Sequence, residues 1–337
     1  MYFSSGSGNT CKSLDDGKRK ICEMNGFVCL DPRFSTTRRL TRSKPSDAGN
    51  ALGSCLALPA AAGRKGEGGL RVNGYFKQAE AGGNVGGAPC GKPLITIITA
   101  VFNGEKTLEK SILSVLSQSY DNIEYIVVDG GSRDGTIDIL KQYEHAIDYW
   151  VSQPDAGIYD AWNRGVRLAT GDWIAFLGAD DAYADNAIAG YVDFIAAHQP
   201  GTLEYVSSKV NLIRDAQLLR VVGHAWQWPV FRRYMGVAHV GSMHRRALFE
   251  KYGLFDDSYK ICGDYELLLR PRDTLGAAFF DAVTVNMEVG GVSDANVRVF
   301  DEAARAKILS GKRGALVSHL EKHWAKLKWR MRKYLFK

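Results

Sequence analysis

Short apolar runs alternate with amphipathic segments between residues 94 and 177, and this alternation limits the possible folds more than any other feature of the chain. The first run, 94–99, is rich in β-branched residues, long enough for a buried strand and too short for a helix. Strands that alternate with helices predict a mainly parallel sheet with helices on both faces, so we expect an α/β fold. The predicted strands cover 94–99, 123–128, 147–151 and 173–177, and the predicted helices cover 105–118, 136–144 and 158–169.

Acidic residues lie at or just after the ends of three of these predicted strands. They are Asp129, Asp155 and the adjacent pair Asp180 and Asp181. Since ligands of such sheets bind at the carboxyl ends of the strands, we expect these side chains on one rim. Two adjacent carboxylates repel each other, and a hard divalent cation removes that repulsion and can hold a diphosphate. The alternative for the Asp180–Asp181 pair is a polar turn that closes a strand.

Longer motifs resemble those of glycosyltransferase family 2, whose members are inverting enzymes with the GT-A fold. The matching stretches occur in the family's order and read ITAVFNGE, VLSQSYDNIEYIVVDGGSRDGT, SQPDAGIYDAWNRGVRLATGDWIAFLGADD and CGDYELLLR. The similarity is closest to bacterial enzymes of surface-polysaccharide and O-antigen synthesis. It implies a Rossmann-like GT-A domain over 93–290, with a nucleotide-sugar half (93–205), an acceptor half (206–290) and a C-terminal helical extension (291–337).

The resemblance also implies a site for the nucleotide-sugar donor. Asp129 would accept a hydrogen bond from the base, since a carboxylate suits an imide N–H of uracil or thymine, or guanine N1–H. The alternative is a turn-forming Asp before two glycines. Thr99 and Ala100 would approach the nucleotide. Asp155 would act on the donor side or shape its own turn. The donor would therefore be a nucleotide sugar of UDP, GDP or dTDP type.

The pair Asp180 and Asp181 corresponds to the family's metal-binding acidic motif, with Ala179 in place of its first Asp. Asp181 would bind Mg²⁺ or Mn²⁺, both of which accept oxygen ligands. Asp180 would assist at the metal or contact the ribose. The ion would bridge the diphosphate oxygens and stabilise negative charge on the leaving nucleotide.

The catalytic base is expected at Asp264, where many family members have Glu-Asp and this chain has Gly263-Asp264. Asp264 would remove the proton from the acceptor hydroxyl during one in-line displacement that inverts the anomeric carbon. The alternatives are a helix N-cap role for Asp264 and a base at Glu266. His239 would lie near the acceptor or the diphosphate, with His244, Arg245 and Arg246 close by, or would be structural. Trp226 and Trp228 would stack on a sugar or pack in a core.

The implied activity is metal-dependent transfer of a sugar to a glycan or lipid-linked acceptor in cell-surface polysaccharide biosynthesis. A relative from another class, which binds nucleotide or glycan without catalysis in a membrane-associated assembly, is the alternative. Retention of Asp129, Asp181 and Asp264 favours the enzyme. The sugar, the base, the acceptor and the linkage depend on pocket shape between 206 and 262 and are not predicted.

The C-terminal stretch 312–337 has nine basic residues and one acidic residue. A basic amphipathic helix of this kind is typical of a membrane-surface anchor, here on an anionic membrane. The alternative is a helix packed on the domain with a solvated basic face. No RNA-binding module accompanies it, so no nucleic-acid partner is expected. The apolar residues that recur at helical spacing are Leu316, Leu320, Trp324, Leu327, Met331 and Leu335.

Neither a signal peptide nor an apolar stretch of membrane-spanning length is found in the sequence. We therefore expect a cytoplasmic protein, peripheral at the inner face of the plasma membrane. The six cysteines have irregular spacing, form no zinc pattern and are expected to be reduced. Residues 1–92 are rich in small residues without sustained periodicity, and we expect a largely disordered N-terminal extension there.

Overall fold

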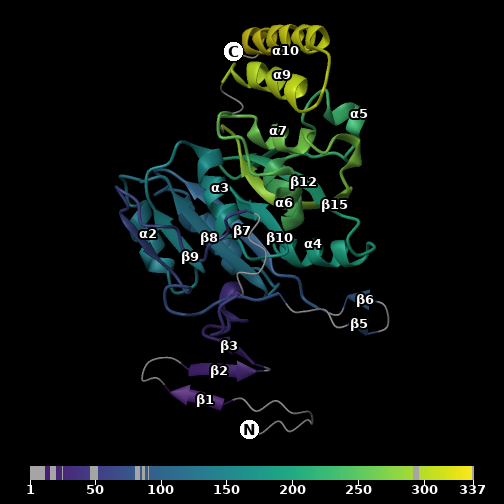
Figure 1. Cartoon of the computed structure of the whole chain (residues 1–337). Coiled ribbons are helices and arrows are strands. Elements are labelled where there is room, and N and C mark those ends of the chain that lie inside the picture. The colour runs from purple at the N-terminus through teal and green to yellow at the C-terminus, as the bar shows by residue number, and fades with distance from the viewer. Residues whose placement is uncertain are drawn as a thin grey trace.

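The computed structural model describes residues 12–15, 20–24, 26–45, 52–79, 84–85, 88–89, 91–290 and 296–335. Within this part of the chain, ten strands form a central sheet with the order β11-β15-β12-β14-β10-β7-β8-β9-β4, and β13 pairs with β12 (Figure 1). The strands are β4 (Gly66–Gly68), β7 (Ile95–Val101), β8 (Ile123–Asp129), β9 (Tyr149–Ser152), β10 (Trp173–Phe176), β11 (Ala182–Tyr183), β12 (Tyr205–Arg214), β13 (Gln217–Val222), β14 (Ser242–Arg245) and β15 (Ala277–Glu288).

Smaller elements lie outside this sheet. Strands β1 (Lys12–Asp15), β2 (Lys20–Met24) and β3 (Phe27–Cys29) form a small antiparallel sheet, and β5 (Asn84–Val85) pairs with β6 (Ala88–Pro89). Short 3-10 helices cover Ser35–Thr37, His239–Gly241 and Arg272–Thr274. The α-helices are α1 (Leu108–Leu116), α2 (Thr136–Tyr143), α3 (Ile158–Leu168), α4 (Ala187–Ala196), α5 (Trp228–Phe231), α6 (Arg246–Tyr252), α7 (Gly263–Leu269), α9 (Val299–Leu309) and α10 (Ala315–Leu335).

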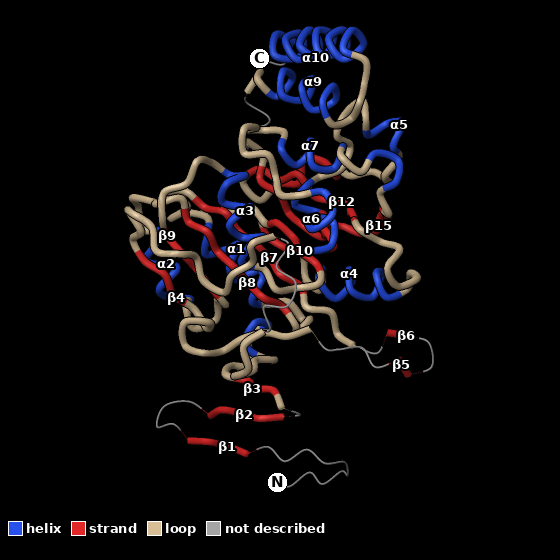
Figure 2. The backbone as a smooth tube through the Cα atoms, in the orientation of Figure 1, coloured by secondary structure: helices blue, strands red, loops and turns tan. Residues whose placement is uncertain are grey.

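The central strands β10, β7, β8 and β9 are parallel to one another, as the alternation of strands and helices predicts. Successive side chains of a strand point to opposite faces. Thus Ile97 packs with helices α1, α2 and α4 on one face, whereas Ile98 packs with α3, α6 and α7 on the other. Figure 2 shows these helices around the red strands. The expected α/β architecture, with a mainly parallel sheet between helices, is confirmed.

The segment before residue 93 differs in part from its expectation. Residues 26–45 and 52–79 are ordered and pack on the domain, so the expected disorder does not hold there. Strand β4 extends the sheet by pairing with β9. The Arg71 guanidinium bonds the Glu124 carboxylate at 2.5 Å, and both side chains are buried. A carboxylate buried in strand β8 needs such a partner, and the partner comes from a segment without apolar periodicity.

Helices α9 and α10 stack at the C-terminal end of the chain, next to α7 (Figure 1). Charged residues contribute to their contact, since Lys322 and Lys326 both bind the Asp301 carboxylate. The opposite side of α10 is apolar and exposed. No helix in the part of the chain that the structure describes is both long and apolar enough to cross a membrane.

Candidate functional site

The carboxyl ends of β7, β8 and β9 form one rim, because Val101, Asp129 and Ser152 face one another across the three strands. Thr99 lies two residues before the end of β7 and is fully buried. Its hydroxyl accepts a hydrogen bond from Tyr125 Oη at 3.2 Å. Ala100, beside it, is half-buried.

Asp129 is fully buried, and its carboxylate accepts hydrogen bonds from its own loop and from β9. Its Oδ2 accepts from the amides of Gly131 at 3.2 Å and Ser132 at 3.0 Å, and from Ser152 Oγ at 2.5 Å. Its Oδ1 accepts from Ser132 Oγ. The turn-forming role that the sequence left as an alternative is therefore present, and a contact between Asp129 and the base stays a prediction.

Asp155 extends over the same loop from the segment that follows β9. Its Oδ1 accepts a hydrogen bond from the Gly157 amide at 2.9 Å. Its Oδ2 would lie 2.7 Å from a Cβ at position 130, so a side chain there would displace the carboxylate. Burial raises the pKa of the Asp155 carboxyl above its usual value. Of the two rim carboxylates, Asp155 is partly exposed, whereas Asp129 is enclosed.

Asp180 and Asp181 follow β10 and bring their carboxylates together. A Cβ at Gly178 would lie 2.5 Å from Asp181 Oδ2 and 2.9 Å from Asp180 Oδ1, so both oxygens lie over this glycine. Asp180 is exposed, and Asp181 is only 4% exposed. The Asp181 Oδ1 accepts a hydrogen bond from the Glu288 amide at 3.1 Å. Burial, helped by the charge of Asp180, raises the pKa of Asp181 to about 7.

Two converging carboxylate oxygens fit a hard divalent cation. Mg²⁺ in particular is commonly bound through one or two carboxylates, with the remaining ligands from substrate phosphates and water. Burial raises the pKa of Asp181, and a bound cation would favour its ionised form. In the described residues, no group of three or more His, Cys, Asp or Glu side chains is arranged to hold a metal ion. The described residues thus offer a pair of carboxylates and no closed cage.

Asp264 is the second residue of α7, whose N-cap is Cys262, so the N-cap alternative for Asp264 does not hold. Its Oδ1 accepts hydrogen bonds from Tyr159 Oη at 3.1 Å and from the Tyr265 amide at 2.8 Å. Burial raises the pKa of this carboxyl to about 6. A Cβ at Gly263 would lie 2.9 Å from the Tyr159 ring, so glycine lets this ring approach the start of α7 closely.

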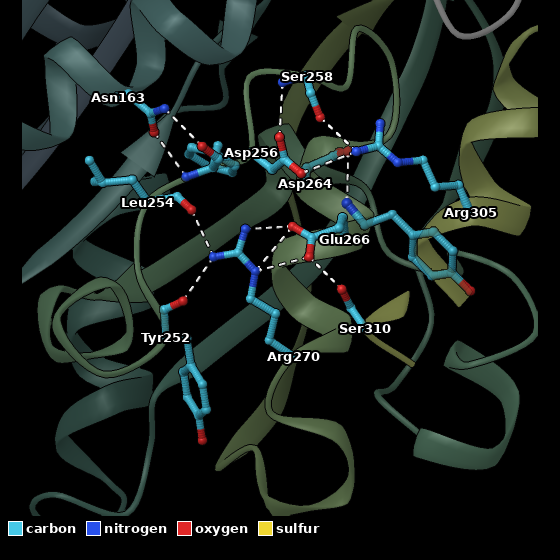
Figure 3. Close-up of polar contacts among 12 residues, drawn as sticks. Asn163, Tyr252, Leu254, Asp256, Ser258, Asp264, Glu266, Arg270, Arg305 and Ser310 are labelled. Carbon is cyan, nitrogen blue, oxygen red and sulfur yellow. Dashed lines mark hydrogen bonds and ion pairs between the residues drawn. The ribbon is translucent and has the colours of Figure 1, made fainter. Parts of the chain in front are cut away.

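Glu266, the alternative base, is engaged elsewhere (Figure 3). Its carboxylate accepts hydrogen bonds from Arg270 Nη2 and from Ser310 Oγ, each at 2.5 Å. The same guanidinium donates to the backbone carbonyls of Tyr252 and Leu254. Glu266 is 5% exposed and serves this structural network, so Asp264 is the better candidate for the base.

His239 lies in a buried aromatic cluster together with His244, one of the residues predicted near it. Its ring is 4.6 Å from that of Trp162 and 5.1 Å from that of His244. Burial lowers the pKa of His239 to about 3, so the ring is neutral at physiological pH. A contact with acceptor or diphosphate stays a prediction, and it would be made by a neutral imidazole.

Trp226 packs against Phe231 with ring centroids 4.1 Å apart and forms one wall of a small open pocket. Trp228, by contrast, lies under the guanidinium of Arg232, 5.9 Å from the ring centroid. The lining of the pocket is largely apolar and includes His224, Trp226, Val230, Phe231, Tyr234 and Val237.

Tyr159, whose hydroxyl bonds the candidate base, is not predicted as a site residue from the sequence. The residue stands in the motif GIYDAWN, and its position in the helix gave no sign of a partner 105 residues away. Glu288, whose amide bonds Asp181, was missed for the same reason. Each contact joins residues that are 105 or 107 positions apart, so it forms only in the folded chain.

Comparison with known proteins identifies the family. Residues 96–253 match the family model described as Glycosyl transferase family 2. A PGL/p-HBAD biosynthesis glycosyltransferase of Mycobacterium bovis is 30% identical over 251 residues, which cover 70% of this chain and 92% of the relative. An uncharacterized glycosyltransferase of Rickettsia typhi is 31% identical over 191 residues, covering 52% of this chain and 57% of the relative.

Two solved structures share the fold. S. aureus TarS 1–349 in complex with UDP-GlcNAc has a TM-score of 0.54 at 15% identity. The match covers 72% of this chain and 73% of the TarS chain. The mannosyltransferase PcManGT from Pyrobaculum calidifontis, in complex with GDP-Man and Mn²⁺, has a TM-score of 0.53 at 19% identity. The match covers 71% of this chain and 72% of the PcManGT chain. With its fold and its relatives in agreement, the chain belongs to glycosyl transferase family 2 and is a glycosyltransferase of the GT-A fold.

Proposed function

We propose that this glycosyltransferase is a metal-dependent inverting enzyme that uses Asp264 as its general base. The observation that carries the proposal is the environment of this carboxylate. Two donors hold its Oδ1, and burial raises its pKa to about 6. A base works best when its pKa lies near the operating pH, because it is then ionised and still accepts a proton readily.

The reaction follows from this carboxylate. Asp264 takes the proton from the acceptor hydroxyl as the hydroxyl oxygen attacks the anomeric carbon, and the nucleoside diphosphate leaves from the opposite side. One displacement inverts that carbon and needs no protein nucleophile. General-base assistance of this kind contributes roughly 10²–10⁴-fold to the rate.

The donor in this proposal is a nucleotide sugar of UDP, GDP or dTDP type. TarS in complex with UDP-GlcNAc and PcManGT in complex with GDP-Man support the class, although not the individual donor. Asp155 is the best candidate for contacting the base, because it is partly exposed beside the side-chain-free Gly130. Asp129 supports the loop that contains Gly131 and Ser132 through their amides. Thr99 and Ala100 are placed at the tip of β7, the predicted nucleotide side.

Asp181 and Asp180 would hold Mg²⁺ or Mn²⁺. The bound ion would supply positive charge against the diphosphate of the leaving group, a contribution of several kcal/mol in such sites. The protein's own part is to keep two carboxylates converged over Gly178 and to fix Asp181 through the Glu288 amide. The bound Mn²⁺ in PcManGT supports the choice of metal.

The acceptor is proposed to be a glycan or a lipid-linked glycan of cell-surface polysaccharide biosynthesis, of which O-antigen assembly is one case. The Mycobacterium relative is named for PGL/p-HBAD biosynthesis. The apolar pocket around Trp226 and Phe231 gives this half of the molecule a surface for a sugar face or an apolar aglycone. His239 would contribute as a neutral imidazole.

We further propose that α10 rests on an anionic membrane surface at the cytoplasmic face. Its apolar row is exposed: Leu320 is 62% exposed and Trp324 58% exposed. Burial of such side chains in the interface favours binding, and each basic group near an anionic leaflet adds about 1 kcal/mol. Lys322 and Lys326 already bind Asp301, so Lys328, which is exposed, is better placed to contribute. The side chain of Leu335 lies outside the described residues.

Asp264→Asn tests the proposed function. The variant should bind nucleotide and metal as the wild type does and lose transfer by 10²-fold or more, since the base is gone and its shape is kept. Unchanged turnover would show that Asp264 is not the base. The non-catalytic alternative predicts that the wild type itself releases no nucleoside diphosphate from any nucleotide sugar that it binds.

A further inference from the structure

The segment that carries the candidate base is held by a helix outside the matched family region. The family model ends at residue 253, whereas the loop 256–262, here called the base loop, leads directly into α7 and Asp264. Helix α9, at Val299–Leu309, lies against both. Helix α9 covers part of the apolar core, and it also makes polar contacts with the base loop.

Glu302 on α9 accepts hydrogen bonds from three consecutive backbone amides of the base loop. Its Oε2 accepts from Lys260 N at 3.1 Å, Ile261 N at 2.8 Å and Cys262 N at 2.9 Å, and its Oε1 accepts from Lys260 N at 3.0 Å. These are the last amides before α7 begins. A carboxylate at a helix N-terminus is also favoured by the helix dipole.

Other contacts hold the base loop on both sides. From α9, the Arg305 guanidinium donates to Ser258 Oγ at 2.8 Å and lies 3.5 Å from the Asp256 carboxylate (Figure 3). On the opposite side, Lys260 Nζ donates to the carbonyl of Ala156 at 2.9 Å, within the turn that follows Asp155. The base loop therefore lies between α9 and the turn on the predicted donor side.

We infer that Glu302 is a positioning residue for the transfer reaction: by binding the amides of residues 260–262 it fixes the start of α7 and so the place of Asp264 relative to the donor-side turn. The inference rests on the proposed role of Asp264. It deepens that role, because the placement of the base then depends on a helix beyond the matched family domain.

Geometry explains why a carboxylate suits this place. Three amides that converge on one point need an acceptor with several lone pairs, and the two oxygens of a carboxylate provide them. Hydrogen bonds to an ionised acceptor are shorter and stronger than those between neutral groups. An amide side chain of the same shape has one acceptor oxygen and an NH₂ group that would face the amide of Lys260. Glu302→Gln therefore loosens the base loop and leaves the volume of residue 302 unchanged.

Hydrogen exchange tests, without any substrate, whether Glu302 holds the base loop. In Glu302→Gln, the amides of residues 260–262 should exchange at least tenfold faster than in the wild type. The matched control is Asp301→Asn, on the same helix, whose carboxylate binds Lys322 and Lys326 of α10 and not the base loop. Exchange that is unchanged in Glu302→Gln, or equally faster in both variants, would overturn the inference.

Kinetics test the consequence for the reaction. Glu302→Gln should lower kcat roughly tenfold to hundredfold, since misplacement of a catalytic group by about 1 Å has effects of that size. The KM for the nucleotide sugar and the affinity for its nucleoside diphosphate should not change. Glu302→Asp keeps the charge on a shorter side chain, so its kcat should lie between those of Glu302→Gln and the wild type. If Glu302→Gln folds poorly, Glu302→Asp is the variant to measure.

A double-mutant cycle separates positioning from general stability. In the Asp264→Asn background, Glu302→Gln should cause little further loss of nucleoside diphosphate release, because there is no base left to position. An equal loss in both backgrounds would mean that Glu302 acts on the fold alone and would overturn the inference. If Asp264→Asn by itself leaves turnover unchanged, the proposed base is wrong, which is a different failure.

Discussion

Removal of the Tyr159 hydroxyl tests the environment of the proposed base most sharply. Tyr159 Oη donates to Asp264 Oδ1 at 3.1 Å, and this bond stabilises the ionised carboxylate. Tyr159→Phe removes the donor and keeps the ring that packs on Gly263. The pKa of Asp264 is about 6 with the hydroxyl in place, and it should rise when the hydroxyl is lost.

The size of the effect follows from the strength of the bond. A hydrogen bond to a charged group contributes about 1.5–3 kcal/mol, and the lower end applies to a partly exposed carboxylate. That corresponds to about one pKa unit, so Asp264 should titrate near ~7 in the variant. At pH 6 the ionised fraction falls from about a half to about a tenth, which is a roughly fivefold loss of kcat/KM. Above pH 8 the two proteins should differ little.

The assay is nucleoside diphosphate release as a function of pH between about 5 and 9, because the pH profile of kcat/KM reports the base in the free enzyme. The acid limb of the kcat/KM profile should lie about one pH unit higher in Tyr159→Phe than in the wild type. Tyr143→Phe is the matched control, since its hydroxyl bonds Glu109 on the surface of α2 and α1. An acid limb that stays in place, or moves to lower pH, would refute this description of Asp264.

Other perturbations probe the metal site, the membrane surface and the N-terminal packing. The raised pKa of Asp181 means that its ionisation opposes folding increasingly from about pH 4 to about 7, so Asp181→Asn should raise Tm in EDTA at pH 8 and abolish the rise that Mn²⁺ causes in the wild type. A lower Tm would show that the carboxylate is structural. Leu320→Gln with Trp324→Gln should weaken binding to vesicles with anionic lipid at least tenfold without changing Tm, since both side chains are exposed; equal binding would exclude α10 as the anchor. Arg71→Met should destabilise the fold by about 3–5 kcal/mol in denaturant titrations, because it leaves Glu124 buried without its cation, whereas Arg33→Met, at an exposed pair, should have almost no effect.

The part of the fold that the sequence predicts is the part with local signals. Strands β7, β8 and β10 are short apolar runs, and helices α1 and α3 have one apolar face, so their positions follow from the sequence pattern. The later strands β12, β14 and β15 were not predicted as elements. Their partners come from distant segments, and the alternation of strands and helices does not continue there.

The candidate site divides in the same way. Asp181 and Asp264 are found from their motifs, because each motif is a continuous stretch. The hydrogen bonds that enclose Asp129 are not found in this way, because its donor Ser132 lies in the loop after β8 and its donor Ser152 lies on strand β9. Glu302 carries no local signal at all, since its importance comes from three amides about forty residues earlier.

Calorimetric titration of UDP, GDP, dTDP and CMP, each with Mn²⁺ and with EDTA, tests the central claim most directly. If Asp180 and Asp181 hold a metal beside a nucleotide diphosphate, one of the diphosphates should bind with Mn²⁺, bind much more weakly in EDTA, and lose its metal dependence in Asp181→Asn. Equal affinity with Mn²⁺ and with EDTA, or metal-dependent binding that survives in Asp181→Asn, would contradict the account.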